Sequence, residues 1–243
     1  MRNLQLRVED SLSDETVLWR YMDLAKYISL LHSGAIWLSR SDTFRDQGEG
    51  RFPREMREEI EKIYEGFGEE PSAKINNVDD FQEYLCKNAY LSCWHRNFNE
   101  NMVMWEIYGR DSNSVAVQTT VGKIKSNISR TTFEGIEFCL RSVSYDDAQG
   151  SEKKRRYIDP FFIKRPHFRF EQEVRIVLST YSGRNPTKET DLGKRVSLNV
   201  AAAIEKVLVH PDCQSWFIDV VKSVSNMYGI RSPVERGFYG NKL

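Results

Sequence analysis

The segment from Thr16 to Ser39 constrains the fold most, because its hydrophobic period changes twice within about 25 residues. Residues 16–21 are β-branched and aromatic, which predicts a strand, and residues 35–39 predict a second one. Between them, Asp23 is a candidate helix N-cap and Gly34 a stop, with apolar residues at helical spacing. The pattern predicts a compact strand–helix–strand unit.

Short apolar segments further along the chain predict more strands mixed with helices. Strands are expected at residues 89–94, 114–119, 136–145, 170–180 and 204–210, and helices at 53–67, 99–109 and 211–229. We therefore expect an α+β fold with mixed, largely antiparallel sheets, about seven to nine strands and four or five helices. At 243 residues, we expect a single domain over residues 1–243, with a mobile loop at 146–156.

Composition argues against several classes of protein. The chain has 35 Lys and Arg against 35 Asp and Glu, and this balance argues against a protein that wraps nucleic acid through its overall charge. No apolar stretch approaches the ~20 residues of a membrane span, and residues 1–12 lack the apolar run of a secretory signal. The four cysteines and four histidines are scattered. We therefore expect a cytoplasmic protein with no membrane partner and no metal, whose oligomeric state the sequence does not indicate.

One candidate site is the segment Glu171-Gln172-Glu173-Val174-Arg175. Side chains on a strand alternate between its faces, so Glu171, Glu173 and Arg175 are expected to point the same way. Two carboxylates at this spacing repel each other, which a protein tolerates at a solvated edge or where a cation compensates. The pattern alone favours a solvated strand face over an active site.

Two aromatic-rich segments are further candidates. Arg20 lies between Trp19 and Tyr21, and Ser92-Cys93-Trp94 is followed by Trp105 and Tyr108. An arginine between aromatic rings can hold a phosphate, because its guanidinium is bidentate and its plane stacks. Equally, it can form a buried ion pair, and the rings can belong to the core. The chain has no glycine-rich dinucleotide loop, Walker A segment or zinc-protease motif.

Charge is unevenly distributed along the chain. Residues 49–83 hold eleven acids against five bases, which predicts a solvated helical face. Residues 151–175 hold eight bases against four acids, beginning with the run Lys153, Lys154, Arg155 and Arg156. This basic segment fits either a solvated loop or a patch for nucleic-acid phosphates. A non-catalytic nucleic-acid- or protein-binding module using residues 153–175 is therefore the alternative to an enzyme, and for nucleic acid it predicts binding that weakens steeply with salt.

Taken in order, these motifs resemble the bacterial family named domain of unknown function 2971. The matching segments are Leu18–Tyr21, Ile36–Ser39, Asp42–Phe44 with Asp46, Glu49-Gly50, Ser92–Trp94, Met104-Trp105 with Tyr108, Phe162–Arg165, Phe170–Arg175, Val207–Pro211, Trp216-Phe217 and Tyr228-Gly229. The opening strand with its arginine, the helix ending in glycine and the next strand are also similar to the start of ADP-ribosyltransferase-like domains. The Glu-x-Glu strand resembles their third motif, whereas the middle motif is Ser-Cys-Trp rather than Ser-Thr-Ser. The resemblance implies an ADP-ribosyltransferase-like core.

This resemblance implies an NAD-dependent ADP-ribosyltransferase or NAD glycohydrolase, acting as a toxin or phage-defence effector. NAD would be the substrate, and the acceptor a protein, nucleic acid or small molecule. The nicotinamide–ribose bond breaks through an oxocarbenium-like transition state, which a nearby carboxylate stabilises. The resemblance makes Glu173 the residue that stabilises the ribosyl cation and Glu171 the one that orients the acceptor. It assigns NAD binding to Arg20, Tyr21, Ser92, Trp105 and Arg175.

The position of Glu173 relative to Arg20 separates an enzyme from a structural role. If both side chains open into one pocket, the arrangement favours catalysis. If both are buried in one closed ion pair, it favours a structural role.

Overall fold

The computed structural model describes residues 4–46, 48–67, 75–109, 111–131, 135–145, 156–181 and 191–238. Within these ranges the fold is α+β, as expected, and ten strands form one sheet in the order β1-β6-β7-β4-β2-β5-β9-β10, with β3 joining β4 to β8. The pairs β1–β6 and β9–β10 are parallel and the other seven pairs are antiparallel. The strands are β1 (Arg7–Val8), β2 (Val17–Asp23), β3 (Ala35–Arg40), β4 (Ala89–Arg96), β5 (Ser114–Thr120), β6 (Glu137–Ser142), β7 (Glu173–Ser179), β8 (Gly193–Ser197), β9 (Lys206–Val209) and β10 (Val234–Arg236).

The described residues contain seven α-helices rather than the four or five expected. They are α1 (Leu24–Ser33), α2 (Arg54–Phe67), α3 (Val78–Lys87), α4 (Met102–Met104), α5 (Val121–Asn127), α6 (Val200–Ala203) and α7 (Ser215–Met227). Three 3₁₀-helices, η1 (Ser41–Thr43), η3 (Asp159–Phe162) and η4 (Pro166–Glu171), and one π-helix, η2 (Trp105–Gly109), complete the set. The helices that were not predicted are α3, α5 and α6, of which α6 has only four residues, too few to show a helical period.

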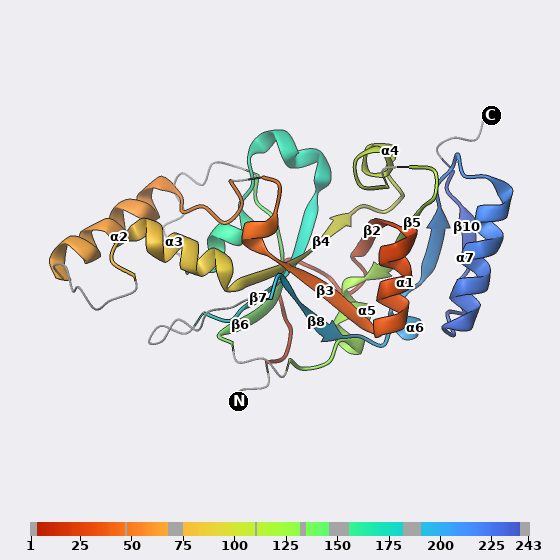
Figure 1. The fold of residues 1–243 in the computed structure, drawn as a ribbon, viewed down its shortest axis with the longest axis horizontal. Helices are drawn as coiled ribbons and strands as arrows, with labels where there is room; N and C mark the ends of the chain where they lie inside the picture. Colours follow the sequence, from red (N-terminus) through yellow and green to blue (C-terminus); the bar gives the residue numbers. More distant parts are fainter. Residues whose placement is uncertain are drawn as a thin grey trace.

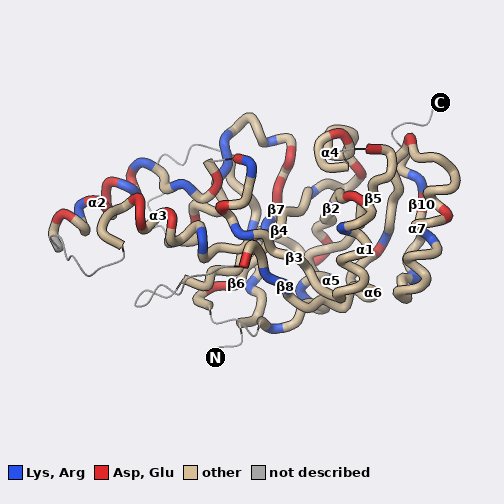
Figure 2. The backbone as a smooth tube through the Cα atoms, in the orientation of Figure 1, with Lys and Arg blue, Asp and Glu red and all other residues tan. Residues whose placement is uncertain are grey.

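The elements lie along an elongated molecule. Figure 1 shows α2 and α3 at one end, α7 and β10 at the other, and the sheet between them. Charged residues of both signs follow one another along α2 and α3 (Figure 2), and exposed ion pairs such as Arg57–Asp79 lie there. The parts of the acid-rich segment in α2 and α3 therefore form a solvated helical face, as predicted, whereas Glu49, which precedes α2, is buried. No helix within the described ranges is long and apolar enough to cross a membrane.

The predicted strand–helix–strand unit forms as β2, α1 and β3. The Asp23 side chain accepts a hydrogen bond from the backbone N–H of Lys26 at 2.8 Å, which caps α1. Gly34 ends the helix in the left-handed conformation, with φ of 55°. Apolar residues of α1, α7 and the central strands form the largest hydrophobic cluster, which fixes the helix against the sheet.

Strands β3 and β2 share one edge of β4, and each pairs with only one end of it. Its start pairs with β3 through Ser39↔Leu91, whereas its end pairs with β2 through Trp19↔His95. Between these contacts, residues 92–94 pair with neither strand, although β7 pairs with β4 along its other edge. The sheet is therefore split along one side of β4, and β2 and β3 diverge there.

In the loop before α2, the backbone of Gly50 lies directly against the ring of Phe161. Gly50 has φ of 68°, and a Cβ atom there would overlap the ring of Phe161 in η3. This contact fixes the neighbouring residue, Glu49, against η3. Gly229 has a similar φ of 72°, but a Cβ there would meet nothing within 4 Å.

Alanine substitutions at Gly50 and Gly229 separate the energetic cost of a strained backbone from the cost of a steric overlap. Gly229→Ala is expected to lower the free energy of unfolding by about 1–2 kcal/mol, from the left-handed backbone alone. Gly50→Ala should cost a further ~1–3 kcal/mol, because the methyl group also displaces Phe161. Urea unfolding of both variants measures this difference. Equal losses would show that the loop accommodates the methyl group freely.

Candidate active site

A cavity of about 710 Å³ opens where β2 and β3 diverge from β4. The side chains that matter for its chemistry are Arg20 and Tyr21 of β2, Trp37 of β3, Tyr108 of η2, Glu173 of β7 and Arg195 of β8. The cavity therefore exists because β4 is paired only at its ends on this side. Residues far apart in the sequence meet in its wall.

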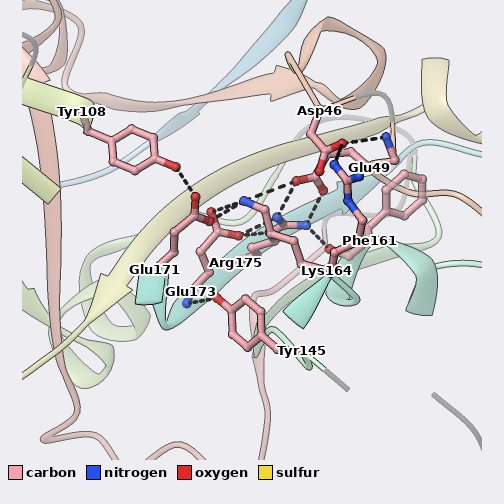
Figure 3. Close-up of polar contacts among 11 residues, drawn as sticks. Asp46, Glu49, Tyr108, Tyr145, Phe161, Lys164, Glu171, Glu173 and Arg175 are labelled. Carbon is pink, nitrogen blue, oxygen red and sulfur yellow. Dashed lines mark hydrogen bonds and ion pairs between the residues drawn. The ribbon is translucent and has the colours of Figure 1, made fainter. Parts of the chain in front are cut away.

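Glu173 is held in place by a fully buried arginine (Figure 3). The Nε of Arg175 donates to Oε2 of Glu173 at 2.7 Å. The two terminal nitrogens of the same guanidinium donate to the two carboxylate oxygens of Glu49, at 2.7 and 2.8 Å. One of them also donates to the backbone carbonyl of Phe161 at 2.8 Å. Arg175 is thus saturated with partners and fixes two carboxylates at once.

Lys164 is the second buried cation of this cluster. Its Nζ donates to Oε2 of Glu171 and lies 3.6 Å from Oε1 of Glu173 and 3.7 Å from Oε1 of Glu49. The other oxygen of Glu171, Oε1, accepts a hydrogen bond from the Tyr108 hydroxyl at 2.7 Å. Lys164 therefore holds the three carboxylates together from one side.

Three carboxylates face two cations here, and this excess of negative charge divides the two candidate catalytic glutamates. Burial and the charge of Glu173 raise the pKa of Glu171. Burial also pushes the pKa of Glu173 upward, but the charges of Arg175 and Lys164 outweigh it and hold that pKa below its usual value. Glu171 is therefore the member of the pair that takes up a proton first as the pH falls.

The cavity wall also carries cations without anionic partners. Within the described residues, Arg20, Arg45 and Arg195 form no ion pair. Arg20 only donates to the backbone carbonyl of Trp37 at 3.4 Å and lies over the ring of Trp94, and Arg195 lies over the ring of Trp37. Unpaired guanidinium groups beside aromatic rings suit an anionic, partly aromatic ligand.

The structure brings Glu173 and Arg20 into one pocket, with no ion pair between them. This is the arrangement that the sequence analysis associated with catalysis. Tyr21 also lines the pocket, and its hydroxyl accepts a hydrogen bond from the backbone N–H of Asn101 at 2.8 Å. That contact directs the hydroxyl toward the backbone and orients the ring.

Three of the predicted NAD-binding residues do not line this pocket. Ser92 is buried, and its hydroxyl accepts a hydrogen bond from the Trp94 indole at 3.2 Å. Trp105 is fully buried, donates to Glu100 at 2.7 Å and packs edge-on against Tyr21. Arg175 is occupied by its two glutamates. The structure places none of the three in the wall of this cavity, and their assignment to NAD binding stays a prediction.

The predicted strand over residues 170–180 begins only at Glu173. Glu171 is the last residue of η4, and Gln172 has a left-handed φ of 41°. Strand alternation therefore does not place Glu171 beside Glu173, and their proximity comes from Lys164 instead. Glu171 is also absent from the pocket wall, although its carboxylate contacts Tyr108, which lines it.

Several residues of the site were not singled out as site residues. Glu49 and Lys164 lie in loops whose position no hydrophobic period reveals. Both belong to the family motifs, and they were otherwise noted only as members of the acid-rich and the basic segment. His95 is buried in the pocket wall, and its Nδ1 lies 2.6 Å from the backbone carbonyl of Glu171. The hydroxyl of Tyr145 accepts a hydrogen bond from the backbone N–H of Glu173 at 2.7 Å. These contacts join segments that are far apart in the sequence, and a single sequence does not indicate which distant segments meet.

The basic segment is described only in part. Lys153, Lys154 and Arg155, like most of the expected mobile loop at 146–156, lie outside the described residues. Arg156 is paired with Glu137 at 2.5 Å and Arg165 with Asp46 at 2.9 Å. With Lys164 and Arg175 also paired, these four bases do not form a free phosphate-binding surface. No group of metal-ligating side chains occurs among the described residues.

Similarity to known proteins is found among solved structures. No family model and no curated protein matches the chain, so its resemblance to domain of unknown function 2971 stays a prediction. Among solved structures, DarT from Thermus sp. 2.9 in complex with NAD+ aligns with a TM-score of 0.42 and 8% identity, over 93% of this chain and 96% of that one. The same protein in complex with ADP-ribosylated ssDNA aligns with a TM-score of 0.39 and 7% identity, over 93% and 95%. At these scores we draw no conclusion from the similarity about this chain's activity.

The buried cluster makes a prediction about stability. Arg175→Met leaves Glu49 and Glu173 without their main partner, so the free energy of unfolding should fall by about 3–5 kcal/mol. Arg141 is the matched control, because it lies opposite Arg175 on β6 and pairs with Asp159 at a partly exposed position. Arg141→Met should cost at most about 1 kcal/mol. Chemical denaturation compares them, and similar losses would contradict a special role for the buried cluster.

Proposed function

We propose that this chain is an NAD-dependent ADP-ribosyltransferase or NAD glycohydrolase. The observation that carries the proposal is one cavity lined both by Glu173, whose pKa is lowered, and by three arginines that form no ion pair with any described residue. NAD has the matching distribution of charge. Its diphosphate is anionic, and its ribose becomes cationic when the bond to nicotinamide breaks. The sequence resemblance implies that such an enzyme would act as a toxin or phage-defence effector in the cytoplasm.

Glu173 supplies the negative charge that this bond cleavage needs. As the C1′–nitrogen bond of NAD breaks, its electron pair leaves with nicotinamide and positive charge develops on the ribose. A fixed carboxylate stabilises that charge without reorganising, and Arg175 keeps Glu173 ionised and immobile. Glycoside hydrolases meet a comparable demand with carboxylates.

Arg20, Arg45 and Arg195 are the residues that would hold the diphosphate. Burial lowers the pKa of Arg20, and an anionic ligand beside it would restore the stability of its charged form. Tyr21 and the exposed ring of Trp37 offer apolar faces for the two aromatic ends of NAD. The cavity thus offers a cationic region for the phosphates and a carboxylate for the reacting ribose.

Nicotinamide release tests the proposal. When the protein is incubated with NAD and the products are followed by mass spectrometry, nicotinamide should form with time. Glu173→Gln keeps the size of the side chain but removes its charge, so the rate should fall about 100-fold or more. Arg20→Met should instead weaken NAD binding, seen as a smaller rise in Tm at millimolar NAD.

Glu137→Gln is the matched control, because Glu137 lies on β6, pairs with Arg7 and Arg156, and does not line the cavity. It should leave nicotinamide release unchanged. If the unaltered protein releases no more nicotinamide than Glu173→Gln under several acceptor conditions, the proposed function is wrong.

A further inference from the structure

Glu171 cannot meet a substrate directly in this structure. Only 3% of the residue is exposed, and it does not line the cavity. Tyr108 does line the cavity, is 37% exposed, and donates its hydroxyl proton to Oε1 of Glu171 at 2.7 Å. Figure 3 shows the Tyr108 hydroxyl directed at the Glu171 carboxylate, so Tyr108 connects the wall of the cavity to this buried acid.

The surroundings of Tyr108 fit a proton carrier. It lies in the π-helix η2, and such irregular turns occur frequently at functional sites. Burial and the negative charge of Glu171 raise the pKa of Tyr108, so its hydroxyl stays protonated and acts as a donor. Glu171 itself is anchored at its other oxygen by Lys164 and at its backbone carbonyl by His95.

We propose that Tyr108 is a catalytic residue that contacts the acceptor and passes the acceptor's proton to Glu171. This inference rests on the proposed function. With water as the acceptor, the water oxygen bonds to C1′ of the ribose as the C1′–nitrogen bond breaks and its electrons leave with nicotinamide. The water proton moves to the Tyr108 oxygen, and the proton of Tyr108 moves to Glu171. Glu171 later releases that proton to solvent, so atoms and charge balance.

The charges around Glu171 suit the role of final proton acceptor. The groups that face it or adjoin it are Glu173 and Arg175 of β7, Tyr108 of η2, His95 and Cys93 of β4, Lys164, Tyr145 and Glu49. Burial and Glu173 raise the pKa of Glu171, which makes its carboxylate a stronger base. Lys164 opposes this rise, and it is a positioning residue because its Nζ donates to Oε2 of Glu171.

Tyr108→Phe is the central test, because it keeps the ring and removes only the hydroxyl. With NAD in water, ADP-ribose formation should fall about 100-fold, while the rise in Tm at millimolar NAD stays the same. In the unaltered protein the rate should increase as pH rises through the pKa of Glu171, because only ionised Glu171 accepts the proton. That increase should disappear in Tyr108→Phe. Tyr228→Phe is the matched control, since Tyr228 is also 37% exposed but lies at the end of α7; it should match the unaltered protein.

A second readout does not depend on NAD. In protein labelled with ¹³C at the ζ carbon of tyrosine, the signal missing from Tyr108→Phe identifies Tyr108. This signal should shift with pH as Glu171 titrates, and the shift should vanish in Glu171→Gln.

The outcomes are distinguishable. If the unaltered protein does not cleave NAD, the proposed function fails and the relay fails with it. If NAD is cleaved but Tyr108→Phe keeps both the rate and its pH dependence, or if the tyrosine signal ignores Glu171, the relay alone is wrong.

Discussion

The buried guanidinium of Arg175 is the interaction on which the site depends. It comes from the middle of the sheet, yet its partners come from the loop before α2, from η3 and from its own strand. A buried arginine must satisfy its donors, so each of these segments is drawn to one point. Its role is to hold Glu173 ionised and to fix the loop that carries Glu49. Arg175 therefore positions the site without contacting the cavity.

The second constraint is the incomplete pairing of β4. Its edge against β7 is continuous, whereas its opposite edge is shared by β3 and β2. A sheet that divides in this way leaves a space between the diverging strands, and side chains from both strands then point into it. The same division puts the arginine of β2 within one cavity wall with the glutamate of β7. The site is thus a consequence of sheet topology as much as of its residues.

Two neighbouring regions of the site, the buried cluster and the cavity wall, differ in their charge. In the buried cluster, carboxylates outnumber cations and one glutamate is pushed toward its protonated form. In the cavity wall, three guanidinium groups have no anionic partner within the part of the chain that the structure describes. A ligand with a phosphate group at one end and a reacting sugar at the other complements both regions. The overall charge of zero averages over such local differences and says little about them.

The local structure followed from the sequence, because caps and hydrophobic periods act within a few residues. β2, α1 and β3 could be predicted from Asp23, Gly34 and the changes of period, and Arg20 and Glu173 could be proposed from their motifs. What the sequence could not decide was which distant groups meet. The pairing of β4 with both β2 and β3, the approach of Glu49 and Lys164 to Glu173, and the burial of Trp105 depend on contacts between segments far apart in the chain. Even the proximity of Glu171 to Glu173 arose from Lys164 rather than from strand alternation, because a left-handed turn at Gln172 interrupts the strand. The sequence alone therefore determined the strand–helix–strand unit and several further strands and helices, and it pointed to three residues of the cavity wall, Arg20, Tyr21 and Glu173. Only tertiary packing decided which charges face the cavity and which are neutralised beneath it.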